Sequence, residues 1–175
     1  MPEALADLVS GRKVVVRGKV VPRDLLASPV DGEPCVYYNY SVEEWRHSQL
    51  AGLPEGFWRM TAHDEAIAEF YLQDETGRAI VAPQDVRIDR ARGVHAQRID
   101  LGYETRRASQ LLIRPGDLIE VCAIADVVDD LYDDARDYRA RARVVMLRAP
   151  EGEQTLIRVL PNRPVAVSES TAIAP

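Results

Sequence analysis

The stretch KVVVRGKVV (residues 13–21) decides the fold that this sequence predicts. β-Branched residues dominate it, which is typical of a β-strand, and Gly18 interrupts it near the middle. A glycine inside a strand favours a bulge or a sharp bend, because it has no side chain to resist one. We therefore expect residues 13–21 to form a strand that coils sharply at Gly18.

Two patterns further along the chain extend this prediction. FYLQDETGRAIVAP (residues 70–83) places apolar runs on both sides of a turn, which predicts a β-hairpin with Gly77 at positive φ. IRPGDLIEVCAIADVV (residues 113–128) predicts a turn at 115–117 followed by a long strand. In this order the patterns are typical of a small OB-like barrel. We therefore expect a mainly β chain folded as a closed or nearly closed antiparallel barrel with OB-like strand order.

The remaining segments complete the expected organisation. Residues 2–10 predict a short helix with Leu5, Leu8 and Val9 on one face. Insertions into the barrel are expected at 44–66 and 84–110, the second with a loop or short helix near 104–110. Further strands are expected at 35–45, 57–62, 66–74, 86–88, 139–147, 155–161 and 165–169. The chain would then comprise a helix within 1–11, one barrel domain over 12–170 and a loose tail over 171–175.

The overall composition narrows the class of protein. Hydrophobic residues make up 46% and charged residues 29% of the 175 residues, which predicts a folded domain. The net charge of −6 argues against nucleic-acid binding, which depends on neutralising phosphates. Arginine far outnumbers lysine, which suggests GC-rich coding and a bacterial source.

Cysteine content and hydropathy bear on the compartment. Cys35 and Cys122 are too few and too far apart for a zinc cage or a disulfide framework, so buried free thiols are expected. The sequence has neither an apolar signal core nor a membrane span of about 18 apolar residues. These features favour a soluble, cytoplasmic protein.

Several of these motifs together resemble a known family. The order is Gly-Lys-Val-Val-Pro (18–22), Ser-Pro-x-x-Gly-x-Pro-Cys-Val-Tyr-Tyr (28–38), Glu-Glu-Trp (43–45), the hairpin at 70–81 and Gly-Asp-x-Ile-x-Val (116–121). The chain resembles, over about residues 12–170, the GIDE domain, also called the BAM ("beside a membrane") domain. That domain occurs in mitochondrial ubiquitin ligases and in bacterial membrane proteins.

The resemblance implies a protein-interaction module that contacts a substrate or partner, in a membrane-proximal or multi-protein assembly. It does not imply ligase activity, because the family's ligases use a zinc-bound RING finger. Here the two cysteines and His47, His63 and His95 have no zinc-ligand spacing. The flanking transmembrane helices of those ligases are missing too. A partner could therefore provide the link to a membrane.

Aromatic residues supply the first candidate binding site. Alternation in 35–45 predicts Val36, Tyr38 and Tyr40 on one face and Tyr37 and Asn39 on the other. We predict Tyr37, Trp45 and Trp58 as exposed partner-binding residues. Stacking of nucleic-acid bases or sugars on an OB-like groove is the alternative function.

Two charged segments carry further hypotheses. The acidic run is read as a solvated hairpin tip, with a calcium loop or a partner-docking loop around Asp130 and Tyr132 as alternatives. The arginine-rich run is read as a solvated face in preference to a phosphate or nucleic-acid site. Their opposite charges favour head-to-tail self-association. The acidic run comprises Asp126, Asp129, Asp130, Asp133, Asp134 and Asp137, and the arginine-rich run comprises Arg87, Arg90, Arg92, Arg98, Arg106 and Arg107.

Catalytic chemistry has one weak motif. His63 and Asp64 are adjacent and suggest acid–base chemistry, so a hydrolase using them is a further alternative. No third orienting group can be identified, and Cys35 has no neighbouring histidine. We therefore expect a protein without enzymatic activity, bound metal or cofactor.

Overall fold

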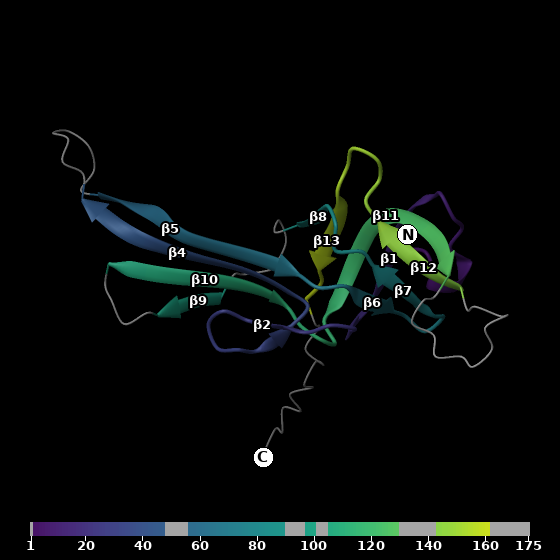
Figure 1. Ribbon diagram of the computed structural model, residues 1–175, viewed down its shortest axis with the longest axis horizontal. Coiled ribbons are helices and arrows are strands. Elements are labelled where there is room, and N and C mark those ends of the chain that lie inside the picture. Colours follow the sequence, from purple (N-terminus) through teal and green to yellow (C-terminus); the bar gives the residue numbers. More distant parts are fainter. Residues whose placement is uncertain (1, 48–55, 90–96, 101–104, 130–142, 162–175) are drawn as a thin grey trace, which may run out of the picture.

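The computed structural model describes residues 2–47, 56–89, 97–100, 105–129 and 143–161. They form a β-barrel from which a long four-stranded sheet, here called the arm, projects to one side (Figure 1). The expected mainly β, OB-like barrel is therefore confirmed.

Five strands close the barrel in the order β1-β6-β7-β12-β11 and back to β1. All neighbouring strands are antiparallel except β7 and β12, which run parallel. The barrel is therefore mixed, whereas the sequence predicted an antiparallel one. In this order β1, β6 and β7 form a three-stranded meander, and β11 and β12 fill the space between β7 and β1 to close the barrel. The five strands are β1 (Lys13–Pro22), β6 (Phe70–Gln73), β7 (Arg78–Val81), β11 (Leu118–Asp129) and β12 (Arg143–Arg148).

Closure depends on β1, which changes partners partway along its length. Its first part, Lys13 to Lys19, pairs with β11, and its last part, Lys19 to Pro22, pairs with β6. The change occurs at Lys19, and at the adjacent Gly18 a Cβ atom would lie 2.5 Å from the backbone oxygen of Gln73. The position at which the sequence predicts a coil is therefore one where the backbones of β1 and β6 approach more closely than a side chain would allow.

The β6–β7 hairpin is present, but Gly77 does not have positive φ. The turn is instead held by Asp74, whose Oδ1 accepts hydrogen bonds from the backbone N–H groups of Thr76 (2.7 Å) and Gly77 (2.9 Å). A carboxylate that bonds its own turn in this way replaces the backbone geometry that glycine would otherwise supply.

The predicted N-terminal helix over 2–10 is reduced to one 3₁₀ turn, η1 (Leu5–Asp7). Asp74 Oδ2 accepts the Leu5 N–H at 2.9 Å, and Glu3 bridges to Val16, so the backbone finds its partners outside a helix. Leu5 and Leu8 are buried as expected, whereas Val9 is 55% exposed. A segment this short gains little from helix formation, and tertiary contacts decide its shape.

The arm is built from the two long connections between barrel strands. Its order is β5-β4-β10-β9. β4 and β5 lie between β1 and β6, and β9 and β10 lie between β7 and β11. The connections that contain the insertions expected at 44–66 and 84–110 extend beyond those bounds, and their strands pair with each other. The arm strands are β4 (Tyr37–His47), β5 (Gly56–Ile67), β9 (Gln97–Asp100) and β10 (Arg106–Ile113).

The loop or short helix expected near 104–110 is wrong for the residues from Arg106 onward, because they begin β10. β10 pairs with β4 over eight residues, from Arg106–Glu44 to Ile113–Tyr37. The strand expected at 57–62 also continues to Ile67, and a break at 68–69 separates it from β6. Long-range pairing, which the local pattern does not contain, overrides the local preference here.

Four short strands complete the described structure. β8 (Val86–Ile88) runs parallel to β13 (Thr155–Val159), which lengthens the barrel sheet beside β11. β2 (Leu26–Ala27) and β3 (Pro34–Cys35) form a small hairpin. The start of the strand expected at 139–147, the strand expected at 165–169 and the tail over 171–175 lie outside the described residues.

One hydrophobic core runs from the barrel into the base of the arm. Phe70, Ile119 and Leu147 fill the barrel with fully buried side chains. Tyr37 and Ile113, a cross-strand pair at the base of the arm, belong to the same cluster. The arm is thus anchored by the core of the barrel.

We predict that Gly18→Ala destabilises the fold by about 1–3 kcal/mol, because the new methyl group must push β1 away from Gln73. Gly77→Ala is the matched control, since a Cβ there meets nothing within 4 Å. Urea unfolding of both variants measures the difference. Equal stability of the two would show that β1 and β6 are not in close contact.

Asp74 gives a second prediction. Burial raises the pKa of Asp74, but hydrogen bonds from Thr76, Leu5 and Gly77 outweigh this and hold the pKa below its ordinary value. The charged carboxylate therefore stabilises the fold above the unfolded pKa of about 4, and this contribution is lost as pH falls through the folded pKa.

Asp74→Ala should cost about 1–2 kcal/mol at neutral pH through the lost hydrogen bonds. Asp74→Asn keeps an oxygen acceptor but cannot titrate. The difference in unfolding free energy between the wild type and Asp74→Asn should shrink as the pH falls below about 4. A difference that stays constant down to pH 2 would contradict the assigned role.

Candidate functional site

The arm presents two different faces. One, here called the tryptophan face, carries Trp45 and Trp58, which are paired directly across β4 and β5. The opposite one, here called the tyrosine face, carries Tyr38 and Tyr40, because successive side chains on a strand alternate. The predicted alternation between Tyr37 and Tyr38 is therefore present.

Polar side chains form successive rungs along the tryptophan face. The Tyr37 hydroxyl donates to Glu65 Oε1 at 2.7 Å, and Asn39 Nδ2 lies 3.1 Å from His63 Nε2. Ser41 and Ser109 join their hydroxyls at 2.9 Å. Each rung ties β4 to a neighbouring strand, so these contacts stiffen the arm over its length.

The outer end of this face carries an aromatic cluster, here called the aromatic tip (Trp45, Trp58 and Arg107). The two indole rings are edge to face, with centroids 5.4 Å apart and planes at 65°. The Arg107 guanidinium lies 4.2 Å from the centre of the Trp58 ring, and its Nε donates to Glu43 at 2.6 Å. The tip is thus held in one geometry by an aromatic pair, a cation–π contact and an ion pair.

Gly56 makes room for the aromatic tip. A Cβ atom at this position would lie 2.6 Å from two carbon atoms of the Trp45 ring. The indole therefore lies against bare backbone, which further limits its motion. This glycine has a packing function that its position next to a turn-like segment did not reveal.

Large apolar side chains are exposed on both faces near the tip. Met60 is 56% exposed on the tryptophan face, and Phe57 is 55% exposed on the tyrosine face. Trp and Met are enriched, and Lys and Glu depleted, in the cores of protein interfaces. The outer end of the arm therefore exposes apolar residue types that are enriched in interface cores, next to the charged Glu43 and Glu44.

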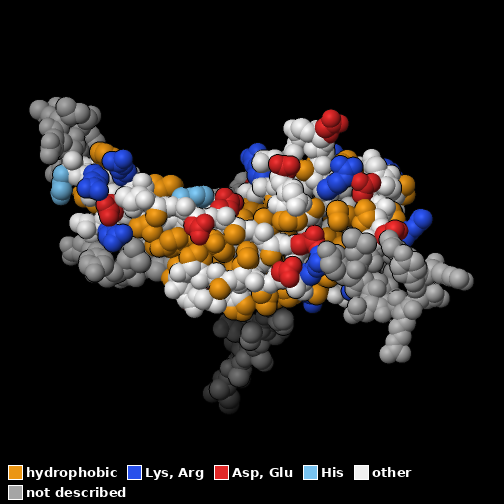
Figure 2. All heavy atoms as spheres, in the orientation of Figure 1, with side chains coloured by type: hydrophobic (Ala, Val, Ile, Leu, Met, Phe, Trp, Pro, Cys, Tyr) orange, Lys and Arg blue, Asp and Glu red, His pale blue; other side chains and the backbone are white. Residues whose placement is uncertain are grey.

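Positive charge also gathers at the outer end of the arm (Figure 2). Arg46 and Arg106 both pair with Glu44, at 2.9 Å and 3.3 Å. Arg59 is exposed and forms no ion pair with any residue the structure describes. The tip thus carries a local cationic excess on a chain whose net charge is −6.

The tyrosine face is more covered near the barrel. Tyr38 and Tyr40 are half-buried, and Tyr38 donates its hydroxyl to Asp64 at 3.0 Å. This hydrogen bond to a carboxylate raises the pKa of Tyr38. Ser28, in the segment between β2 and β3, reaches buried Gln110 at 3.3 Å. These tyrosines therefore act mainly as packing residues.

The predicted partner-binding residues divide into three groups. Trp45 and Trp58 lie together at the aromatic tip. Tyr37 is only 2% exposed and belongs to the core, so its prediction as an exposed binding residue is wrong. It begins β4 where the arm meets the barrel, and its ring is needed there to fill space. Asp130 and Tyr132 lie outside the described residues.

His63 and Asp64 point to opposite faces of the arm, as consecutive residues of β5 must. Both are exposed; His63 meets Asn39 and Asp64 meets Tyr38. This geometry does not bring them to a common reacting atom. The cysteines are both free; Cys35 is fully buried, and burial raises the pKa of its thiol.

The charged runs are divided by the fold. Asp126 accepts hydrogen bonds from Arg148 and Ser10, and these hold its pKa low. Asp129 lies at the end of β11, and the other four acids fall outside the described residues. Within the described ranges, no three His, Cys, Asp or Glu side chains converge as metal ligands would. Of the arginines, Arg98, Arg106 and Arg107 lie on strands of the arm and Arg87 lies on β8, whereas Arg90 and Arg92 fall outside the described residues.

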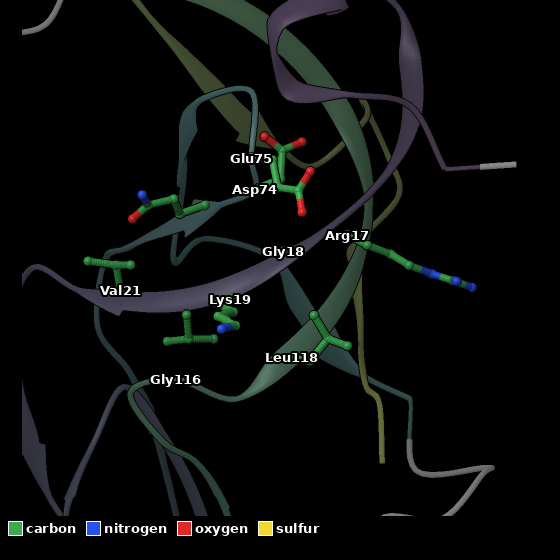
Figure 3. Close-up of a pocket in the computed structure, with 10 residues that line it drawn as sticks. Arg17, Gly18, Lys19, Val21, Asp74, Glu75, Gly116 and Leu118 are labelled. Atoms are coloured by element: carbon green, nitrogen blue, oxygen red, sulfur yellow. The ribbon is translucent and has the colours of Figure 1, made fainter. Parts of the chain in front are cut away.

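The barrel also carries a pocket of about 550 Å³ between β1, the β6–β7 turn and the β10–β11 turn (Figure 3). Lys19 and Arg17 line it together with Asp74 and Glu75. Arg17 is already paired with Glu120, and Asp74 is engaged by its own turn. The lining thus holds two basic and two acidic side chains, so it favours neither an anionic nor a cationic ligand.

A scan against models of protein families, a search of curated proteins and a search of solved structures each returned no match for this chain. Within the described residues, no helical segment has the length and apolarity needed to cross a bilayer.

Sequence reasoning missed two residues of the candidate site. Arg107 was assigned to a solvated run, although β10 places it over Trp58. Met60 was not singled out, although it adjoins Trp58 on the same face. Their positions depend on the register of β4 with β5 and β10, which no local motif specifies.

We predict opposite outcomes for two aromatic substitutions. Tyr37→Ala should lower the unfolding free energy by about 3–5 kcal/mol, because it leaves a cavity in the shared core. Trp58→Ala should cost only about 1–2 kcal/mol, the contribution of an aromatic pair and a partly exposed cation–π contact. Guanidinium unfolding of both variants measures these costs. A larger cost for Trp58 than for Tyr37 would contradict the division between core and surface.

Proposed function

We propose that this chain is a non-enzymatic protein-interaction module that docks a partner protein through the outer end of its arm. The observation that carries this proposal is the aromatic tip, in which Trp45, Trp58 and Arg107 are held rigidly at the surface. Trp and Arg are the residue types that most often dominate binding energy in protein interfaces.

Preorganisation supports the same conclusion. The polar rungs along the tryptophan face and the close packing of Trp45 on Gly56 fix the tip before a partner arrives. Ordering a side chain on binding costs about 0.5–1.5 kcal/mol, so a rigid tip loses less affinity than a mobile one. The barrel needs none of these contacts for its own closure. A function in binding accounts for them.

The resemblance to the GIDE domain family supports the class of function. In that family the domain contacts a substrate or partner beside a membrane. By this analogy the partner would be a protein of a membrane-associated or multi-protein assembly, in the cytoplasm of a bacterial cell. The resemblance carries no catalytic step over to this chain.

A second candidate function rests on a different observation. On the hairpin β6–β7, the Arg78 guanidinium lies 4.7 Å from the centre of the Tyr71 ring. OB-like barrels bind single-stranded nucleic acids or oligosaccharides on the equivalent strands. The acidic Asp74 and Glu75 at the end of the hairpin oppose a phosphate backbone. Binding of a labelled oligothymidylate that weakens steeply with salt would favour this candidate over the first.

A site-specific photo-crosslinker tests the docking proposal. We expect a crosslinking residue at Met60 to capture a discrete protein in the source cell, and a residue at Val9 to capture none. The two positions are matched in exposure, at 56% and 55%, but lie on the arm and on the N-terminal segment. Mass spectrometry of the crosslinked bands measures the outcome.

Adding Trp58→Ala to the Met60 crosslinker should lower the yield about tenfold or more, as expected when an interface anchor worth 2 kcal/mol or so is removed. Arg17→Ala, on the barrel, should leave the yield unchanged. Equal yields from Met60 and Val9, insensitive to Trp58, would refute docking through the arm.

A further inference from the structure

The strand β5 leaves one long edge of the arm uncovered. It is the terminal strand of the order β5-β4-β10-β9, and no other strand in the described part of the chain pairs with its outer side. It spans 12 residues, and the stretch from Thr61 to Glu65 is exposed throughout. The other terminal strand, β9, has only 4 residues. We call the outer side of β5 the open edge.

The register shows which backbone groups point out of the open edge. The Trp45 N–H donates to Thr105 O at 2.8 Å, so the backbone of Trp45 is engaged by β10 and not by its partner Trp58. At the other end, the Ala68 N–H donates to Val36 O at 2.8 Å. In an antiparallel pair hydrogen-bonded and non-bonded positions alternate.

Two sets of residues follow from this alternation. Ala62, Asp64 and Ala66 direct their N–H and C=O groups to β4. The groups that point outward, to the open edge, belong to Trp58, Met60, His63 and Glu65. The side chains of all four outward residues lie on the tryptophan face.

Natural proteins protect such an edge with lysine or other charged side chains, with proline, with a bulge or by keeping the strand short, because unpaired backbone groups recruit other strands. β5 contains neither lysine nor proline, and its one irregularity is the bulge opposite Val42 and Glu43. Extended segments bind proteins by adding a strand to an exposed sheet edge of this kind, and here the edge lies beside the aromatic tip.

Charge along β5 is divided between its two ends. Arg59, near the tip, is exposed and forms no ion pair with a described residue. Asp64 and Glu65 lie nearer the barrel. Among the described side chains, only tyrosine hydroxyls donate hydrogen bonds to them. A segment lying along the open edge would therefore be favoured with an acidic residue near Arg59 and basic residues near Asp64 and Glu65.

We propose that the partner protein adds an extended segment to the open edge of β5 as a fifth, antiparallel strand of the arm. Antiparallel addition is the more stable geometry per residue. The segment carries basic residues toward its N-terminal end, an acidic residue toward its C-terminal end, and apolar side chains that lie over Met60 and Trp58. This inference rests on the proposed function and specifies how the partner binds.

The probe is the peptide acetyl-Lys-Lys-Thr-Val-Ile-Glu-Ile-Thr-amide, in which the lysines face Glu65 and Asp64, the glutamate faces Arg59, and the two isoleucines face Met60 and Trp58. Its control exchanges the charges: acetyl-Glu-Glu-Thr-Val-Ile-Lys-Ile-Thr-amide. Amide hydrogen exchange by NMR reports on each backbone N–H of the full chain, without and with either peptide.

In the free protein the amides of Ala62 and Asp64 should exchange slowly and those of His63 and Glu65 fast. The probe should slow His63 and Glu65 by about tenfold or more at saturation, and the control peptide should bind at least about tenfold more weakly. Slow exchange of His63 and Glu65 in the free protein at all concentrations would mean that the chain covers its own edge. Protection that appears only as the concentration rises would mean that a second copy covers it. Either result overturns the proposal.

A pair of variants isolates the backbone contribution. His63→Pro removes one outward N–H without removing a bond to β4, and proline is tolerated on that side of an edge strand. It should weaken binding of the probe about tenfold, whereas His63→Ala, which keeps the N–H, should change it by less than about twofold. Circular dichroism confirms that both variants fold. If His63→Pro is misfolded, Glu65→Pro against Glu65→Ala gives the same comparison, and equal binding within a folded pair overturns the proposal.

The two levels of the proposal can fail separately. If the Met60 crosslinker captures a partner that depends on Trp58, but that capture is unaffected by His63→Pro and the probe protects no outward amide, then the arm docks proteins without strand addition. If the Met60 crosslinker captures no protein and the probe protects no outward amide, both the proposed docking function and the strand-addition proposal fail.

Discussion

Closure of the barrel depends on the approach of β1 to β6 at Gly18, which is closer than any side chain would allow. At the next residue, Lys19, β1 leaves β11 and begins to pair with β6, so one strand joins two neighbours of the barrel. A Cβ atom would lie 2.5 Å from Gln73 O, so any side chain at this position would have to push β1 away from β6. With the barrel closed, the ends of β1, β6, β7 and β11 are fixed in space. The two long connections between these strands therefore leave the barrel at fixed points.

Those connections become a single sheet because their starting points are adjacent. Tyr37 at the start of β4 and Ile113 at the end of β10 are paired across the strands and buried in the barrel core. Once this pair is in place, each further residue of β4 meets a residue of β10, out to Glu44 and Arg106. The arm is thus a projection of the barrel core, extended outward by backbone pairing and then by polar rungs. Its outer end needs no hydrophobic interior, which leaves aromatic side chains there available for binding.

Local patterns predicted the parts of the fold that depend on neighbouring residues. The bend at Gly18, the hairpin over 70–83 and the turn before β11 were all predicted from the sequence. The alternation of Tyr37 and Asn39 against Tyr38 and Tyr40 along β4 was also predicted correctly. What could not be predicted is the burial of Tyr37, because this depends on where the arm leaves the barrel. For the same reason β10 was interpreted as a loop or short helix: its arginines favour no strand until β4 lies beside them.

The division of contacts along the arm argues for a binding function more strongly than any single residue. Near the barrel, side chains on the arm are buried, and removing one leaves a cavity. Further out the same face carries paired polar groups, which hold the strands together without excluding water. At the end lie two indoles whose rings are fixed by each other, by Arg107 and by the bare backbone of Gly56. A fold under no demand except stability would place its tryptophans where burial is greatest, because apolar area removed from water is what stabilises it. Here both tryptophans are only partly buried, and they lie beside a strand whose outward backbone groups are unpaired in the described structure. That arrangement leaves binding energy unused in the isolated chain, which is the property that a docking surface requires.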